Sequence, residues 1–150
     1  MFFGEVPVGQ AEGAILAHSE TAGGRVLKKG MVLTAADVAA LAQDLSQVTV
    51  ARLDPGDVGE DAAAAALAAA LVPDPMAQGL TLSTAFTGRV NLNAAGPGIV
   101  EIDADAILSL NRIDPAITLA TLPPWQRVTA GTLAGTVKII AYAVGGAALA

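Results

Sequence analysis

The chain has 150 residues, contains no cysteine and carries a net charge of −6 at pH 7. Without cysteine it has no disulfide, no zinc–thiolate site and no thiol nucleophile. Its eight Lys and Arg residues are spread along the sequence, whereas nucleic-acid-binding proteins cluster their cations, so nucleic acid is not an expected partner.

The first residues, 1–6, lack the basic start and long apolar stretch of a secretory signal. The apolar runs 62–72 and 139–150 are both shorter than the ~20 residues that a helix needs to cross a bilayer. We therefore expect a cytoplasmic protein with no membrane span.

The first part of the chain predicts short strands around glycine turns. Residues 14–18 are predicted to form a strand, Gly23-Gly24 a turn, and residues 25–33 a hairpin with Lys28-Lys29-Gly30 at its tip. Residues 48–52 alternate apolar and polar side chains, which indicates a second strand.

Between these strands, Thr34 and Asp37 are spaced as a variant capping box. They predict a helix whose apolar face contains Val38, Leu41 and Leu45.

A second, alanine-rich helix is predicted over residues 58–71, with Asp57 and Glu60 at its start. Pro73 and Pro75 end it, because proline cannot continue a helix. The prolines and the change from helical to strand patterns within 72–78 predict a hinge between two lobes, 1–72 and 79–150.

The second lobe is predicted to be rich in β structure. One short helix, capped by Asp103 or Asp105, interrupts the strands. The expected fold class is α+β, with two to three short helices and a barrel-like or sandwich-like β lobe. The predicted strands are 80–83, 88–91, 99–102, 117–121 and 133–142.

Polar side chains within these apolar runs are the candidate binding residues. Arg89 and Asn91 lie two apart on a predicted strand, so they should share a face and present a guanidinium beside an amide to a phosphate or a pterin edge. Lys138 interrupts a strand fit for burial and must reach solvent, an acid or a ligand. The candidates for ligand binding are Arg89, Asn91, Asn111, Arg112, Asp114 and Lys138.

Each of these residues also has a structural interpretation. Asn111 and Asp114 flank a turn that such side chains commonly close, and Arg89 with Asp114 would suit a buried network. Lys138 would snorkel or pair with an acid.

Other polar residues point more weakly to function. His18 has no histidine partner for a metal site and is interpreted as a structural residue. The acids Asp54, Asp57, Glu60 and Asp61 have oxygen ligands that suit Mg²⁺, but a turn and a helix start explain all four. Trp125 is predicted to anchor a loop on the sheet.

Taken in order, six segments resemble the N-terminal region of bacterial molybdopterin-binding proteins of molybdenum cofactor biosynthesis. The least specific of them is the hairpin and capped helix at 25–41, and the resemblance spans nearly the whole chain. The segments are Glu12–His18, 25–41, Val50–Asp61, Phe86–Leu92, Asn111–Leu122 and Thr136–Ile140.

The resemblance implies a non-catalytic N-terminal domain that binds molybdopterin or places neighbouring domains. Its partner would be a C-terminal molybdopterin-binding domain of the same, longer protein, followed in some members by a nucleotidyltransferase domain. The chain itself offers no nucleophile with a base, so it is not expected to be an enzyme. The alternative is a purely structural or homo-oligomerisation module that binds no ligand.

Overall fold

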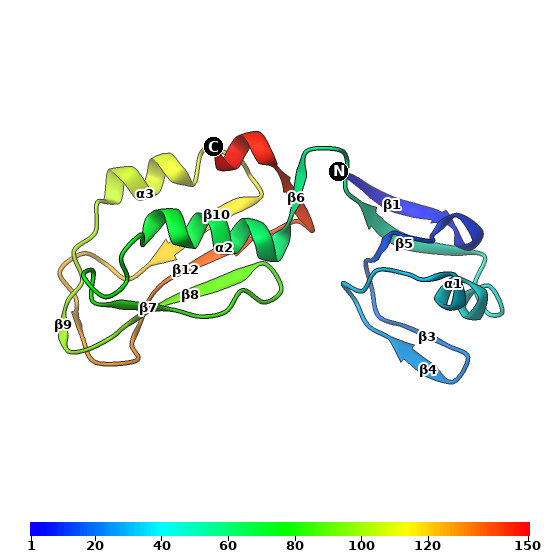
Figure 1. Cartoon of the computed structure of the whole chain (residues 1–150), viewed down its shortest axis with the longest axis horizontal. Coiled ribbons are helices and arrows are strands. Elements are labelled where there is room, and N and C mark those ends of the chain that lie inside the picture. The colour runs from blue at the N-terminus through cyan, green and yellow to red at the C-terminus, as the bar shows by residue number, and fades with distance from the viewer. The chain divides into compact units, whose positions relative to one another are not determined.

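The computed structural model describes residues 1–150, which divide into two compact units, Met1–Pro55 and Gly56–Ala150 (Figure 1). Each unit has its own cluster of buried side chains. Leu16, Leu41 and Val50 belong to the first cluster, and Val90 and Val137 belong to the second. No residue belongs to both clusters, so the two hydrophobic cores are separate.

The first unit is built on a three-stranded antiparallel sheet in the order β1 (Phe2–Pro7), β5 (Gln47–Arg52), β2 (Ile15–Leu16). Alternation along β5 buries Val48 and Val50, which confirms the predicted strand. A 3-10 turn, η1 (Val8–Gln10), follows β1.

A small hairpin, β3 (Glu20–Ala22) and β4 (Arg25–Leu27), turns at Gly23-Gly24, as predicted. Both glycines have positive φ, 56° and 76°, which is the conformation that two-residue hairpins require. The predicted hairpin over 25–33 is wrong, because β4 pairs with β3, the strand that precedes it in the chain. After Gly30 the chain instead bridges Val32 to Ile15.

Helix α1 (Ala35–Leu41) begins at the predicted capping box. The Thr34 hydroxyl accepts a hydrogen bond from the Asp37 N–H at 3.3 Å, and the Thr34 N–H donates to the Asp37 carboxylate at 2.9 Å. The helix buries Leu41 against the first core.

The second unit is built on a four-stranded antiparallel sheet. Its order is β10 (Ile117–Thr121), β12 (Leu133–Ile139), β8 (Arg89–Ala94), β7 (Leu80–Leu82). The α+β fold class is confirmed, and the sheet is open, with β10 and β7 at its edges, rather than a closed barrel.

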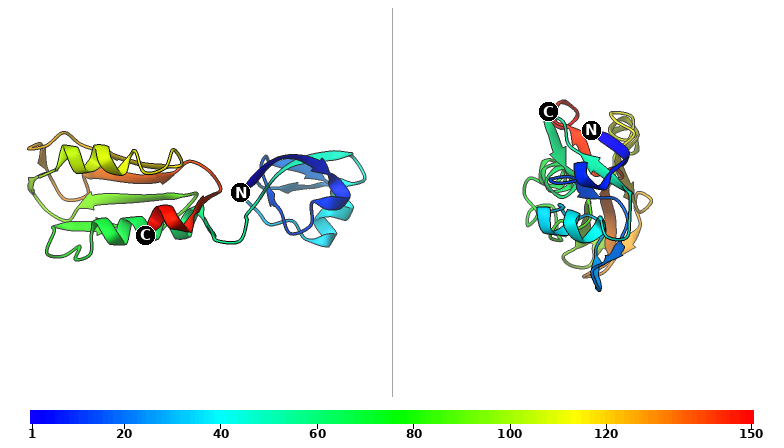
Figure 2. Two further views of the ribbon diagram at one scale, coloured as in Figure 1. Left: turned by 90° about the horizontal axis from the view of Figure 1, so that it is seen from above. Right: turned by 90° about the vertical axis from the view of Figure 1, so that its right-hand side faces the viewer.

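Helix α2 (Glu60–Leu71) lies along one side of this sheet (Figures 1 and 2). It buries Ala63, Ala64 and Ala68 in the same cluster as Val90 and Val137, so small side chains allow a close approach. For this reason the predicted hinge at 72–78 lies inside the second unit, whose boundary is at Pro55–Gly56.

The ends of α2 agree only partly with the predictions. It stops at Leu71 before Pro73, as expected, but Asp57 does not cap it. Residues Asp57–Gly59 form β6, which pairs with the distant β13 (Ala143–Gly145), and Gly59 occupies the N-cap position.

The remaining elements close the second unit. Helix α3 (Ala104–Leu110) is capped by Asp103, whose carboxylate accepts from the Ala106 N–H at 3.0 Å. A ribbon of β9 (Gly98–Ile99) and β11 (Arg127–Val128) and a final 3-10 turn, η2 (Gly146–Leu149), complete it. None of the helices has both the length and the apolar character needed to cross a bilayer.

Candidate functional site

The sheet of the second unit has one face that no helix covers. Alternation along β8 sends Val90 and Leu92 into the core with α2. The alternate residues of β8 point to the side of the sheet opposite α2. We call this side the open face; it carries Arg89, Asn91, Asn93, Thr118, Thr136 and Lys138.

Two cations stand directly opposite each other on the open face. Lys138 of β12 is the register partner of Arg89 of β8. The Lys138 ammonium donates to the Thr87 carbonyl oxygen, whereas Arg89 is exposed and its guanidinium makes no hydrogen bond or ion pair. Like charges opposite each other destabilise a sheet, so this pair has an unfavourable interaction that an anion would relieve.

The turn before Arg89 fixes where β8 begins. Phe86 and Arg89 exchange backbone hydrogen bonds of 3.1 Å in both directions, which leaves Thr87 and Gly88 as a two-residue turn with φ of 49° and 68°. The Gly88 N–H donates to the Asp61 carboxylate at 2.6 Å. This turn is therefore tied to α2 by Asp61 and to β12 by Lys138.

Asn91 lies on the same face as Arg89, as predicted. Its Oδ1 accepts from the Thr136 hydroxyl at 3.1 Å, and its Nδ2 has no hydrogen-bond partner. The open face thus presents two cations and one unused amide donor, and none of its six residues is acidic.

The structure does not bring the segment 111–114 into this group. The Asn111 amide accepts from the Leu119 N–H at 2.7 Å and donates to the Leu119 carbonyl at 3.0 Å. The Asn111 side chain thereby satisfies backbone groups on the free edge of β10, as a further strand would. Asp114 accepts from the Ala116 N–H at 2.8 Å in an Asx turn, and the exposed side chain of Arg112 makes no hydrogen bond.

The other candidates have structural surroundings. His18 is exposed after β2, and Asp54 pairs with the N-terminal amine at 2.6 Å. No group of three or more His, Asp or Glu side chains is arranged to hold a metal ion. The predicted anchoring of Trp125 is wrong, because its side chain is 68% exposed.

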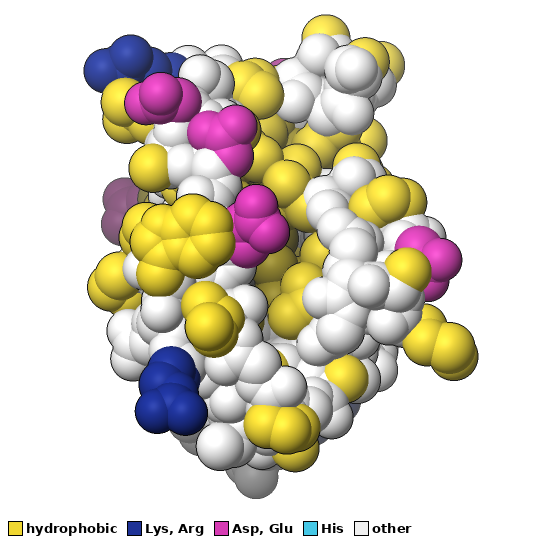
Figure 3. Space-filling model, turned by 90° about the vertical axis from the view of Figure 1, so that its left-hand side faces the viewer, with side chains coloured by type: hydrophobic (Ala, Val, Ile, Leu, Met, Phe, Trp, Pro, Cys, Tyr) yellow, Lys and Arg dark blue, Asp and Glu magenta, His cyan; other side chains and the backbone are white.

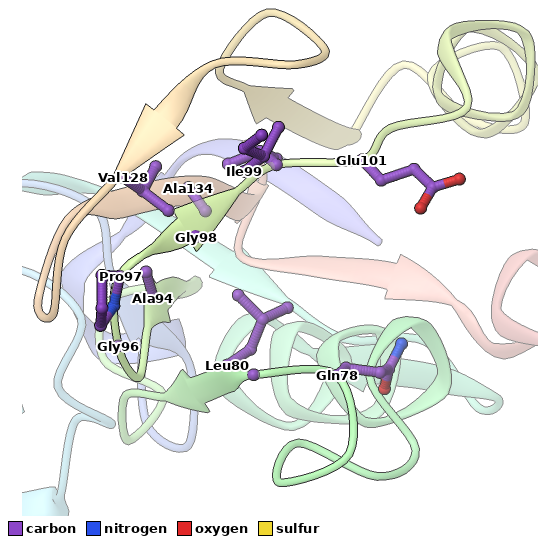
Figure 4. Close-up of a pocket in the computed structure, with 12 residues that line it drawn as sticks. Gln78, Leu80, Ala94, Gly96, Pro97, Gly98, Ile99, Glu101, Val128 and Ala134 are labelled. Carbon is purple, nitrogen blue, oxygen red and sulfur yellow. The ribbon is translucent and has the colours of Figure 1, made fainter.

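A groove at one end of the second unit escaped the sequence analysis. Two adjoining pockets of about 540 and 400 Å³ share Leu80, Val100 and Glu101 in their lining. Figure 3 views this end and shows a hollow with an apolar floor and acidic side chains beside it. In the close-up of Figure 4, Leu80 points into the pocket, with Gln78 and Glu101 on its walls.

We call this hollow the end groove. Its apolar lining comes from α2, α3 and several strands, so no local pattern in the sequence signals it. None of the six predicted binding residues lines it. The main lining residues are Leu71, Leu80, Leu92, Val100, Ile107 and Leu119, with Gln78, Glu101 and Asp103 at the polar side.

Comparison with known proteins gives a match for part of the first unit. Residues 5–51 match a family model described as a domain of unknown function (DUF8806). No curated protein and no solved structure matches the chain. The matched residues lie in Met1–Pro55, so both the open face and the end groove lie outside them.

Proposed function

We propose that the chain is a non-catalytic domain of a molybdopterin-binding protein in molybdenum cofactor biosynthesis. In this proposal the open face contacts the anionic part of molybdopterin, and a C-terminal domain of the same protein holds the rest. The support comes from the resemblance of the six segments and from the chemistry of the open face.

One observation carries the proposal: the Arg89 guanidinium has no hydrogen-bond or ion-pair partner although it stands opposite Lys138. A phosphate between the two side chains would accept charge-assisted hydrogen bonds from both and remove their repulsion. The free Nδ2 of Asn91 lies on the same face and would donate to a further oxygen of the ligand.

The open face offers donors and no pair of nucleophile and base. Its hydroxyls belong to Thr118 and Thr136, which are already hydrogen bonded to the Lys138 carbonyl and to Asn91. We therefore propose that this domain binds and orients the ligand and leaves its bonds unchanged.

A structural or oligomerisation module is the second candidate. It is favoured by Asn111 and Asp114, whose side chains already satisfy nearby backbone groups. It is also favoured by two large apolar residues next to the open face, Phe86 and Ile140, which are 75% and 61% exposed.

Calorimetric titration of the chain with molybdopterin separates the two candidates. We expect saturable heat, and at least roughly tenfold weaker binding for Arg89→Gln and Lys138→Gln, because each removes one charged donor. Arg127→Gln is the matched control, since Arg127 is also exposed but lies on β11. If no heat is released, or if Arg127→Gln weakens binding equally, the ligand proposal fails.

A further inference from the structure

We propose that the end groove docks a segment of another protein that presents large apolar side chains flanked by Lys or Arg. This proposal does not depend on the molybdopterin proposal, because the open face and the end groove share no residue.

The groove is an uncovered extension of the hydrophobic core. Leu92 and Leu119 at its floor are 7% and 4% exposed and belong to the core cluster. Leu71, Leu80 and Ile107 pack against that cluster but are only partly buried. An apolar side chain placed here would therefore complete the burial of side chains that are already partly buried.

Helix α3 shows the same incomplete burial. None of its side chains is fully buried, although Ile107 and Leu110 face the core. A helix that buries no residue completely gains little from packing, so an occupant of the groove would add the contacts that α3 lacks.

Two large apolar side chains at the groove are exposed to solvent. Ile99, which lines the groove, is 63% exposed, and Trp125 next to the groove is 68% exposed. The Trp125 N–H donates to the Val100 carbonyl at 2.7 Å, which places Trp125 beside the groove wall. Trp125 has φ of 67°, a conformation that glycine adopts more easily. Tryptophan is enriched in binding hot spots, and strained backbone is common at functional sites.

The charge of the groove selects the partner. Glu101 and Asp103 line it, and no Lys or Arg lines either pocket. Glu101 makes no hydrogen bond or ion pair, and the whole chain carries −6. Basic residues beside an apolar anchor would pair with these carboxylates and would speed association with an acidic chain.

A protein segment fits this surface better than a small ligand does. A small molecule that filled the pockets would contact Ile99 but leave Trp125 in solvent, because Trp125 lines neither pocket. A second copy of the chain is the other possible occupant, since it carries basic Lys28-Lys29 between exposed Val26 and Val32.

The test uses two pools of labelled peptides of about 12 residues, a length typical of groove-binding segments. Both pools have Leu, Phe or Trp at central positions; one has Lys and Arg at the flanks and the other has Asp and Glu. Fluorescence anisotropy with the intact chain should show saturable binding of the basic pool and none of the acidic pool. Equal binding of both pools, or of neither, would overturn the proposal.

Two variants locate the binding. Trp125→Gly introduces a residue that adopts positive φ easily, so we expect unchanged or higher thermal stability. The variant also removes the exposed indole, so the basic pool should bind at least roughly tenfold more weakly. Glu101→Gln with Asp103→Asn should also weaken it. Ile113→Ser is the control, because it removes a large apolar side chain that is 59% exposed but lies outside the groove.

The remaining outcomes are also decisive. Full affinity in Trp125→Gly would contradict the proposal, whatever the variant does to stability. Self-association of the free chain that Lys28→Glu with Lys29→Glu abolishes would assign the groove to a second copy instead. The open face and the end groove share no residue, and Arg89→Gln leaves the groove intact. Failure of the molybdopterin titration would therefore not affect the outcome of the peptide test.

Discussion

The left-handed backbone at Thr87 and Gly88 determines how the cations of the open face are placed. A Cβ atom at Gly88 would lie 2.8 Å from the Ile139 carbonyl oxygen and 2.9 Å from the Glu60 carboxylate. Only glycine therefore fits between α2 and β12, and this close approach lets Lys138 reach the turn that precedes Arg89.

Gly88→Ala should consequently destabilise the second unit by about 2–4 kcal/mol, because it adds both a left-handed alanine and a clash with backbone. Gly79→Ala is the matched control: Gly79 has φ of 64°, but a Cβ atom added there would meet nothing within 4 Å. We expect it to cost about 1–2 kcal/mol. Urea unfolding measures both, and equal losses would show that the close approach is not rigid.

At the scale of elements, the capping box gives α1 a dependence on pH. Hydrogen bonds from the Thr34 hydroxyl and backbone N–H, aided by the Arg25 guanidinium and opposed by burial, lower the pKa of the Asp37 carboxyl in the folded chain. The ionised form thus stabilises the fold above the unfolded pKa of about 3.9. This stabilisation is lost as the pH falls through the lower folded pKa.

The stability difference between the natural chain and Asp37→Asn should therefore be largest at neutral pH and shrink below about pH 4. Urea midpoints measured across this range test it. Asp44→Asn removes the same charge from an exposed position and should show no such trend. A difference that stays constant down to about pH 2 would contradict the role of the carboxylate.

Helix α2 depends on alanine for its distance from the sheet. Ala64 is fully buried, and Ala65 beside it is exposed. Ala64→Leu should cost about 1–3 kcal/mol through overpacking, and Ala65→Leu should stay within about 0.5 kcal/mol. Thermal unfolding distinguishes them; a tolerated Ala64→Leu would mean that the helix can move away from the sheet.

Local signals in the sequence predict several elements well. The Thr34–Asp37 box, the Gly23-Gly24 turn and the alternation in β5 each involve neighbours in sequence, and all three are confirmed. The open face follows similarly, because alternation alone puts Arg89 and Asn91 on one side.

Other features depend on partners that are distant in the chain. The sequence predicts Asp57 as a helix cap, but Asp57 lies in a strand that pairs with residues 143–145. Such a distant pairing leaves no local signal around Asp57. The opposition of Arg89 and Lys138 depends on strand order, which alternation does not determine. The end groove is assembled from still more segments, so it could not be predicted from any single one.

At the scale of the whole molecule, the two separate cores predict two independently stable units. Leu16 and Val50 pack in one, Val90 and Ile117 in the other, and the division lies at Pro55–Gly56. We expect fragment 56–150 to unfold cooperatively and to keep the amide NMR spectrum that it has in the intact chain. A collapsed, poorly dispersed spectrum would show that it needs residues 1–55.

The central claim, that the open face holds an anionic ligand, is tested most directly by amide NMR of the intact chain during titration with molybdopterin. The account predicts shifts concentrated at Thr87–Asn91 and Thr136–Lys138, and their loss in Arg89→Gln. Shifts confined to other parts of the chain, or no shifts at saturating ligand, would contradict it.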